Sequence, residues 1–263
     1  PSHLQNECTM SRLWSYSLIL VALVWTCAAM ADEVTLEVLD VGQGDSLLLR
    51  NEEGKLVLID AGDRKEDVKK LLQARGITRL DMVVATHPHA DHIGGMKEVL
   101  MNFEVGLYID SGLPHTSGTY TAVMEAVESK GIQYRTAKIG QTYNFGDGAT
   151  FEVLWPGETL LTGTRSDLNS NSVVLRFQNG DDCFLFTGDA EEPTEHQIVS
   201  DGLAQCDVLK VAHHGGNHSS TDAFLNRAQP KIALISAGTG NSYGHPGVET
   251  MARRASMARA TVS

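Results

Sequence analysis

Three histidines and one aspartate stand close together in one short stretch of this sequence. His87, His89, Asp91 and His92 directly follow the apolar run at residues 82–85. Imidazole and carboxylate groups are the ligands that zinc and similar divalent metals prefer, and a loop can turn all four toward one point. The pattern therefore predicts a metal site at the end of a strand rather than an ordinary polar loop.

Further candidate ligands stand in separate motifs, each where a strand is expected to end. These motifs are Ile59-Asp60-Ala61-Gly62, Thr187-Gly188-Asp189, Val211-Ala212-His213-His214-Gly215 and Tyr243-Gly244-His245-Pro246. Loops at the ends of strands can converge on one place. We therefore expect these motifs to lie near the histidine run.

The elements expected around these motifs alternate between short β-rich runs and helices. Strands are expected at residues 34–41, 46–50, 56–59, 82–85, 105–109, 151–154, 172–177, 183–187, 207–212 and 232–236, and helices from a cap at Asp63 to Gly76 and over 94–100, 120–129, 191–200 and 221–228. Two similar halves of strands and helices predict two sheets packed between outer helices. No linker or repeat divides residues 32–263, so they are expected to form one domain.

The motifs, in this order, resemble the metallo-β-lactamase superfamily over residues 34–247. The resemblance implies an α/β fold, the four-layer αββα metallo-β-lactamase sandwich. Within the superfamily the chain is similar to the extracytoplasmic hydrolase domain of competence DNA-uptake proteins (ComEC-like), and bacterial phosphorylcholine esterases look similar in the same places. The motifs that carry this likeness are LDVGQGDS at 39–46, VLKVAHHG at 208–215 and NSYGHP at 241–246.

The resemblance also implies a centre of two metal ions, with zinc as the expected metal and manganese as the alternative. The implied ligands are His87 and His89 for the first ion, Asp91, His92 and His213 for the second, and Asp189 as the bridge. Asp60 is expected to orient a ligand histidine from behind, as such sites usually require. Asp45 and Lys210 are expected to be structural or to support the ligands.

One departure from the family pattern concerns the first ion. Where many members supply a third histidine, this sequence has Asn169-Ser170-Asn171-Ser172. An amide oxygen is a weaker zinc ligand than imidazole, so the first ion is expected to be held more loosely. Asn169 and Asn171 are then expected to support the site or contact the substrate.

The remaining histidines receive separate roles. His214 is expected to pack beside the ligand His213. His245 is expected to contact a substrate phosphate, to protonate a leaving group or to serve the structure alone. The others are expected at the surface: His3, His115, His196 and His218.

These residues predict a secreted metal-dependent hydrolase. A metal-bound water becomes hydroxide near neutral pH, so Asp91, Asp189 and His245 are the expected catalytic residues. A phosphodiesterase or nuclease acting on a small phosphodiester or single-stranded nucleic acid is favoured over a β-lactamase or other ester or amide hydrolase, and over a binding module with a decayed metal site. The net charge of −12 opposes a broad nucleic-acid surface, which favours a short or exposed substrate.

Both ends of the chain carry recognisable patterns. Residues 1–9 look like upstream sequence, and residues 10–31 combine a basic start, an apolar core and a small-x-small end. They predict a signal peptide cleaved after Ala31, an exported periplasmic or extracellular protein and no stable membrane span after cleavage, with an uncleaved anchor or a lipidated Cys27 as alternatives. The mature protein would retain Cys183 and Cys206, as a disulfide or as buried thiols. Residues 247–263 predict a short basic helix, where the fold needs a last helix and strand.

Overall fold

The computed structural model describes residues 34–65, 67–146, 148–255 and 259–262. The expected signal peptide, its cleavage point at Ala31, Cys27 and His3 lie outside the described residues. Asp32–Ser263 form one compact unit. Within the described part of the chain, no helix combines the length and apolar character needed to cross a bilayer.

The first sheet contains six strands in the order of the sequence. They are β1 (Thr35–Val38), β2 (Leu47–Arg50), β3 (Leu56–Ile59), β4 (Arg79–Val84), β5 (Glu104–Asp110) and β6 (Gln133–Thr136). β1 to β3 pair antiparallel, whereas β3 to β6 pair parallel. The apolar sequence of β3 fits its position, because a strand covered on both faces has no solvent side that requires polar residues.

The second sheet contains seven strands in the order β13-β12-β11-β10-β9-β8-β7. Their bounds are β7 (Thr142–Gly146), β8 (Ala149–Trp155), β9 (Val174–Asn179), β10 (Asp182–Phe186), β11 (Val208–Lys210), β12 (Ile232–Ile235) and β13 (Arg259–Val262). β7 to β10 pair antiparallel and β10 to β13 pair parallel. Each sheet thus joins an antiparallel half to a parallel half.

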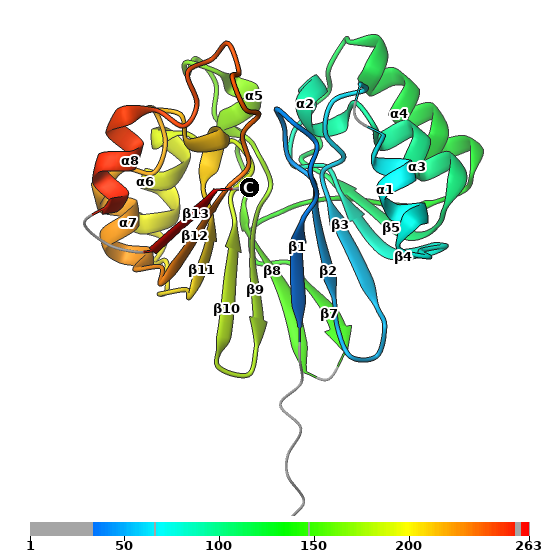
Figure 1. The fold of residues 1–263 in the computed structure, drawn as a ribbon, viewed down its shortest axis with the longest axis horizontal. Helices are drawn as coiled ribbons and strands as arrows, with labels where there is room; N and C mark the ends of the chain where they lie inside the picture. Colours follow the sequence, from blue (N-terminus) through cyan, green and yellow to red (C-terminus); the bar gives the residue numbers. More distant parts are fainter. Residues whose placement is uncertain (1–33, 66, 147, 256–258, 263) are drawn as a thin grey trace, which may run out of the picture. The chain divides into compact units, whose positions relative to one another are not determined.

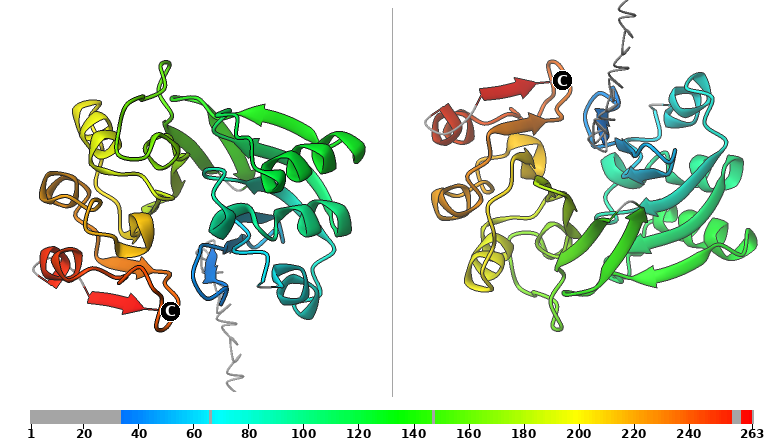
Figure 2. Two further views of the ribbon diagram at one scale, coloured as in Figure 1. Left: turned by 90° about the horizontal axis from the view of Figure 1, so that it is seen from above. Right: turned by 90° about the horizontal axis from the view of Figure 1, so that it is seen from below.

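Helices cover the outer face of each sheet, which gives four layers (Figures 1 and 2). α1 (Val68–Ala74), α3 (Met96–Asn102) and α4 (Gly118–Ser129) lie outside the first sheet, and α6 (Glu192–Ser200), α7 (Asp222–Ala228) and α8 (Val248–Ala255) lie outside the second. Apolar side chains from both sheets, including Leu49, Ile59, Phe151 and Phe177, fill the space between them. The structure therefore confirms the predicted four-layer sandwich.

Three short helices stand at the end of the sandwich where the candidate ligands gather. They are α2 (Ala90–Ile93), α5 (Asp167–Ser170) and the 3₁₀ turn η1 (Ala212–Gly215). α2 and α5 lie at the same end of the two sheets (Figure 1). α2 and η1 lie between a strand and a helix outside the sandwich, whereas α5 lies in the connection between β8 and β9.

Some local predictions differ from the structure. Asp67, not Asp63, caps α1 by accepting from the amide of Lys70, whereas Asp63 accepts from the amide of Lys65. β6 and β7 were not predicted from the sequence. β6 reads QYRT and has mostly exposed side chains, so it lacks the apolar alternation that predicts a strand.

The carboxyl end supplies the expected last helix and strand as α8 and β13. Cys183 and Cys206, which the sequence left open as a disulfide or two thiols, are joined in a disulfide. Both cysteines are buried, and their Cα atoms lie 4.8 Å apart.

Candidate metal centre

The histidine-rich loop begins where β4 ends. His87 and His89 lie in the connection after Val84, and Asp91 and His92 belong to the single turn of α2. The amides of His92 and Ile93 both donate to the carbonyl of His89, at 3.1 and 3.0 Å. A strand end followed at once by a one-turn helix thus brings the four candidate ligands together.

An earlier loop packs against this turn because position 44 is glycine. The amide of Asp45 donates to the carbonyl of Asp91 at 3.1 Å. A Cβ atom on Gly44 would lie 2.3 Å from that carbonyl oxygen, and the φ angle of Gly44 is +140°. Glycine therefore serves both the backbone conformation and the close approach.

Two groups of side chains each bring potential metal-ligand atoms within 4.8 Å of one another. The groups are Asp45, His92, Asp189 and His214, and His87, His89 and Asp189. Asp189, from the connection after β10, belongs to both. Its carboxylate is therefore the link between the two candidate metal positions.

The second position is the more deeply buried of the two. His92 Nε2 and His214 Nε2 lie 3.2 and 3.6 Å from Asp189 Oδ1. Asp91 Oδ2 lies 3.3 Å from His214 Nε2. Two imidazole nitrogens and two carboxylate oxygens thus face one another, which is a donor set suited to zinc or manganese.

The first position has fewer nitrogen and carboxylate donors. His87 Nε2 and His89 Nδ1 lie 2.8 Å apart, and His87 Nε2 lies 3.6 Å from Asp189 Oδ2. The two oxygens of Asp189 therefore face different imidazole groups. This arrangement places a carboxylate where it could bridge two ions.

Buried groups behind the histidines set the direction of their rings. Asp60 Oδ2 lies 2.8 Å from His92 Nδ1, and Asp60 also accepts from the amide and hydroxyl of Thr86. The carbonyl of Ser236 lies 3.0 Å from His214 Nδ1. With Nδ1 occupied in this way, Nε2 of each ring is free to bind metal.

Asp45 also contacts His214 at Nδ1, the ring nitrogen that does not face the second position. Asp45 Oδ1 lies 3.3 Å from His214 Nδ1, and Asp45 Oδ2 lies 2.5 Å from Nζ of the buried Lys210. The Lys210 amine also donates to the carbonyl of Val211. Because Asp45 is engaged by Lys210 behind the ring, we interpret it as a residue that orients His214.

The second position fits a metal ion on the evidence of its own atoms. Among the described residues, His92 Nε2, His214 Nε2 and Asp189 Oδ1 are buried and have no hydrogen-bond partner. Buried polar atoms are normally paired, so three unpaired atoms that face one another indicate a missing partner. A divalent cation satisfies all three.

The ionisation of these side chains agrees with a cation at the second position. Burial lowers the pKa of His214, but the carboxylates of Asp189 and Asp45 outweigh burial and raise that pKa to about 10. Burial also opposes a charge on His92, yet the carboxylates around it raise its pKa well above the usual value. The acidic groups thus attract positive charge into the centre, supplied by protons or by metal.

The first position behaves differently. Burial and the neighbouring charge of His92 lower the pKa values of His87 and His89. Both imidazoles therefore remain neutral near pH 7, which is the form that binds metal.

The geometry revises the sequence-based choice between the two adjacent histidines of η1. His214 is buried and directs Nε2 at Asp189 and Asp91, whereas His213 Nε2 lies 3.9 Å from the other oxygen of Asp189. Positive φ angles at both residues turn the two rings in different directions. Consecutive histidines in a sequence do not show which ring such a turn directs inward.

The two asparagines that replace a family histidine occupy different surroundings. Asn169 is buried, with Nδ2 3.2 Å from Glu191 Oε1 and 3.5 Å from His213 Nε2. Asn171 is bound to the backbone of Leu161 and Asp167, so it fixes a loop and does not line the site. Of this pair, only Asn169 is placed to act at the centre.

Glu191 is a site residue that was not predicted from the sequence. Its Oε1 atom lies 3.3 Å from His213 Nδ1 and 3.2 Å from both Arg165 and Asn169. It stands two residues after Asp189, at the start of α6. An acidic residue before a helix is common, so its position gave no sign of contact with His213 and Asn169.

The centre opens into a hollow of about 290 Å³, here called the metal pocket. Its lining combines ligand candidates with other polar and aromatic side chains: Gln43, His89, Ala90, Asp91, Asn169, Asp189, His213, His214, Tyr243 and His245. Burial and the charges of His213 and His214 lower the pKa of His245. That direction favours a neutral His245 that hydrogen-bonds a substrate over one that donates a proton at pH 7.

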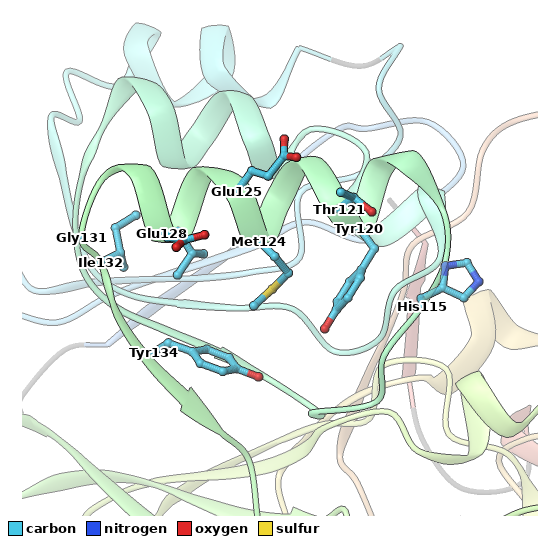
Figure 3. A pocket seen from close by; sticks show the side chains of 10 residues that line it. His115, Tyr120, Thr121, Met124, Glu125, Glu128, Gly131, Ile132 and Tyr134 are labelled. Carbon is cyan, nitrogen blue, oxygen red and sulfur yellow. The ribbon is translucent and has the colours of Figure 1, made fainter.

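A larger hollow of about 640 Å³ lies elsewhere, beside α4 and the edge strand β6. Tyr120 and Met124 of α4 and Tyr134 of β6 lie around it, with His115 at one end (Figure 3). Its lining residues belong to neither metal-binding group identified in the described ranges. His196 and His218 are exposed, as expected for surface histidines.

This fold and this site belong to one known class. The family model of the metallo-beta-lactamase superfamily matches residues 39–239, so the chain belongs to that superfamily of metal-dependent hydrolases. The predicted resemblance to the superfamily is thereby confirmed.

Three curated relatives are similar to the chain in sequence over most of its length. It is 33% identical to the Competence protein ComA of Neisseria gonorrhoeae, over 83% of this chain and 29% of that protein. It is 29% identical to the ComE operon protein 3 of Bacillus subtilis, over 88% of this chain and 31% of that protein. It is 30% identical to the Recombination protein 2 of Haemophilus influenzae, over 95% of this chain and 30% of that protein. The chain thus spans less than a third of the length of these relatives.

Solved structures share the fold at low sequence identity. The metallo-beta-lactamase fold protein YhfI from Bacillus subtilis superimposes with a TM-score of 0.57 at 12% identity, covering 88% of this chain and 96% of that chain. Zn(2+)-bound PqqB from Methylobacterium extorquens gives a TM-score of 0.53 at 11% identity, covering 84% of this chain and 86% of that chain. These similarities support the four-layer architecture.

Proposed function

We propose that this protein is a phosphodiesterase that uses two divalent metal ions, zinc in the first instance and manganese as the alternative. One observation carries the proposal: the two carboxylate oxygens of Asp189 face two different imidazole groups at the floor of the metal pocket. A carboxylate shared in this way is suited to hold two ions side by side. Two ions held by one shared carboxylate would suit the displacement of one oxygen substituent on phosphorus by another.

The ligand groups of this chain divide between the two ions. His87, His89 and Asp189 would hold the first ion, and Asp91, His92 and His214 would join Asp189 around the second. When bound, the ions would lower the pKa of a water molecule and stabilise negative charge on the substrate oxygen.

The remaining residues act on the substrate or on the ligands. His245 and Asn169 line the metal pocket, where their side chains can hydrogen-bond a phosphoryl oxygen. Asp60 and the Ser236 carbonyl hold His92 and His214 in position. In the hydrolysis, a water oxygen bonds to phosphorus, one P–O ester bond breaks, and a proton passes to the leaving alcohol oxygen.

The choice of phosphodiesters over β-lactams is supported by the first position and by the relatives. The first position offers His87, His89 and one oxygen of Asp189, with an amide side chain nearby rather than a third histidine. An anionic phosphoryl oxygen can complete such an open coordination sphere. Relatives named as competence proteins are consistent with a nucleic-acid substrate.

The proposal is tested with bis(p-nitrophenyl) phosphate and nitrocefin, beside metal analysis of the purified protein. We expect faster hydrolysis of the phosphodiester, loss of activity with a chelator, and recovery with zinc or manganese. Asp91→Ala should lower activity at least about tenfold while the circular dichroism spectrum is unchanged. Better hydrolysis of nitrocefin would favour a lactamase instead, and activity that persists through prolonged chelation would exclude the metal mechanism.

We further propose that the protein is exported to the periplasm or the extracellular medium. The signal-like pattern of residues 10–31 supports export, and so does the disulfide between Cys183 and Cys206, because disulfides persist mainly in oxidising compartments. Amino-terminal sequencing of the protein from fractionated cells should give Asp32 as the first residue. Recovery of an unprocessed chain in the cytoplasm would contradict export.

A further inference from the structure

We propose that a second hollow beside the metal pocket binds the nucleoside and the next phosphate of a single-stranded nucleic acid whose scissile phosphate lies at the metals. The inference rests on the proposed phosphodiesterase function and extends it to the substrate. We call this hollow the side pocket. It has a volume of about 310 Å³, and its lining is Arg165, His213, Asn217, His218, Tyr243, Gly244, His245 and Gly247.

The side pocket and the metal pocket share three aromatic residues. His213, Tyr243 and His245 line both hollows. A substrate group held at Asp189 can therefore extend past these rings without crossing the protein interior. The combined volume of the two hollows is larger than one phosphate group requires.

The shared wall includes a stack of rings that leads outward from the centre. The ring of the ligand candidate His214 lies 6.0 Å from that of His245, with 29° between their planes. The ring of Tyr243 lies 5.8 Å from that of His245, with 24° between their planes. Each ring is thus roughly parallel to the next.

Tyr243 ends this stack at the surface. It is 69% exposed. In this position the large aromatic ring makes fewer apolar contacts than it would in the interior. One face of its ring packs on His245, and the other is available to a flat ligand. Nucleobases stack on such exposed aromatic rings regardless of sequence, at about 1–3 kcal/mol per base.

Arg165 gives the lining of the side pocket a positively charged side chain. The guanidinium of Arg165 lies 3.2 Å from Glu191 Oε1 and is 53% exposed, so Glu191 fixes its position without covering it. His218 and Asn217 also line the side pocket and are exposed. In a chain with a net charge of −12, an anchored arginine in a hollow next to the metal site is suited to an anion.

These features offer one binding group for each of three successive parts of a single strand of nucleic acid. The scissile phosphate lies at the acidic, metal-binding end, a base stacks on Tyr243, and an adjoining phosphate approaches Arg165. A duplex hides its bases from such a ring, so the arrangement favours single strands.

The stacking step is tested with two substrates that share the p-nitrophenolate leaving group. Thymidine 5′-(p-nitrophenyl phosphate) carries a nucleoside, whereas methyl p-nitrophenyl phosphate carries a methyl group in its place. We expect Tyr243→Ala to lower kcat/KM about tenfold for the thymidine ester and less than about twofold for the methyl ester. Tyr243→Phe keeps the ring and should retain the preference for the nucleoside.

The phosphate step is tested with an oligothymidylate at several salt concentrations. Arg165→Gln should lessen the dependence of log kcat/KM on log salt by about 0.7, the value for one phosphate contact on a single strand. Arg79→Gln is the matched control, because Arg79 is also ion-paired and is 54% exposed, but it lies at the start of β4 and does not line the side pocket. It should leave the salt dependence unchanged.

The outcomes separate the inference from the function on which it rests. If the metal-loaded protein hydrolyses neither ester, the proposed phosphodiesterase function fails. A different result leaves the function intact but shows that the side pocket is not a nucleotide site. In that result the protein hydrolyses both esters equally well, Tyr243→Ala leaves the ratio of kcat/KM for the two esters unchanged, and Arg165→Gln leaves the salt dependence unchanged. An unchanged circular dichroism spectrum for each variant shows that the fold is retained.

Discussion

His92 Nδ1 lies 2.8 Å from Asp60 Oδ2, and both side chains are fully buried. Asp60 adopts a φ angle of +62°, a conformation that few residues other than glycine take up. In the neutral ring that binds metal, the contact keeps the His92 proton on Nδ1 and leaves the lone pair of Nε2 for the metal position beside Asp189. One carboxylate outside the ligand set thus determines how a ligand is presented.

Asp60→Asn tests this relationship with little change in size. We expect the affinity for the more tightly bound ion to fall about 10–100-fold, because the amide is a poorer acceptor for the His92 N–H. Competition with a chromophoric chelator measures the affinity. Asp182→Asn, at an exposed carboxylate of β10, is the control, and equal affinities in the two variants would show that Asp60 does not support the metal.

His214→Ala and His213→Ala should differ in metal content. Because His214 Nε2 faces Asp189 Oδ1 and Asp91 Oδ2, its loss should remove about one metal ion per chain. His213→Ala should retain both ions and lower turnover, since His213 lines the metal pocket beside Asn169. Elemental analysis after gel filtration gives the stoichiometry, and the reverse pattern would restore His213 as the ligand.

Metal binding should release protons at pH 8. The raised pKa values of His92 and His214, about 10 for the latter, keep both imidazoles protonated in the metal-free protein, and metal ligation requires their neutral forms. We expect about two protons to be released by the ion at the second position, and about one in His214→Ala. Calorimetry in two buffers of different ionisation enthalpy measures the number, and a buffer-independent enthalpy would contradict the expectation.

The same pKa shifts determine how the stability of the metal-free protein depends on pH. A histidine pKa raised above its unfolded value of about 6.5 contributes stability that is complete below that pH and is lost as the pH rises toward 10. The lowered pKa of Asp189 acts in the opposite direction and removes stability in acid. Urea unfolding of the metal-free protein should therefore show lower stability at pH 9.5 than at pH 6.5.

Gly44→Ala should disturb the metal site as well as the fold. The added Cβ would lie 2.3 Å from the Asp91 carbonyl oxygen, and the positive φ adds strain of about 1–3 kcal/mol. Gly54→Ala is the matched control, because Gly54 also has a positive φ but a Cβ there contacts nothing within 4 Å. We expect both variants to melt earlier and only Gly44→Ala to lose metal. Normal metal content in Gly44→Ala would show that the loop accommodates the methyl group.

His245→Ala should lower phosphodiester turnover about 10–100-fold, the range for loss of a hydrogen bond to a charged group. Burial and nearby histidines lower the pKa of His245, so a hydrogen bond from the neutral ring is expected rather than proton donation. The pH–rate profile of the variant should keep the shape of the wild-type profile. A basic limb that disappears in His245→Ala would instead identify it as the general acid.

The sequence predicted the fold where hydrophobic patterns were strong. The buried strands β3 and β4 and the amphipathic α4 were recognisable from apolar periodicity alone. β7 and β6 were not, because both lie at sheet edges where exposed positions carry polar side chains. Edge strands owe their pairing to a neighbour that the local sequence does not identify.

The candidate site likewise combines features that the sequence predicted with features that it did not. The spacing of His87, His89, Asp91 and His92 reflects one local loop, and the structure brings these four residues together with Asp189. The roles of His213 and His214 depend on two left-handed residues in succession, and Glu191 meets His213 and Asn169 only through the packing of distant segments. Such relationships are set by tertiary structure and have no short sequence pattern.

The shared carboxylate of Asp189 also has a mechanical consequence. His92 follows a strand of one sheet, whereas Asp189 and His214 follow strands of the other, so an ion held among them is a cross-link between the two halves of the domain. At this end of the domain the protein's own connections include the bond from the Ser236 hydroxyl to the Gly44 carbonyl. Hydrogen exchange in the loops around α2 and η1 should then speed up when the ions are removed, while the amides of the central strands stay protected. The metal occupancy of this protein would thereby govern whether its two halves open separately or unfold as one.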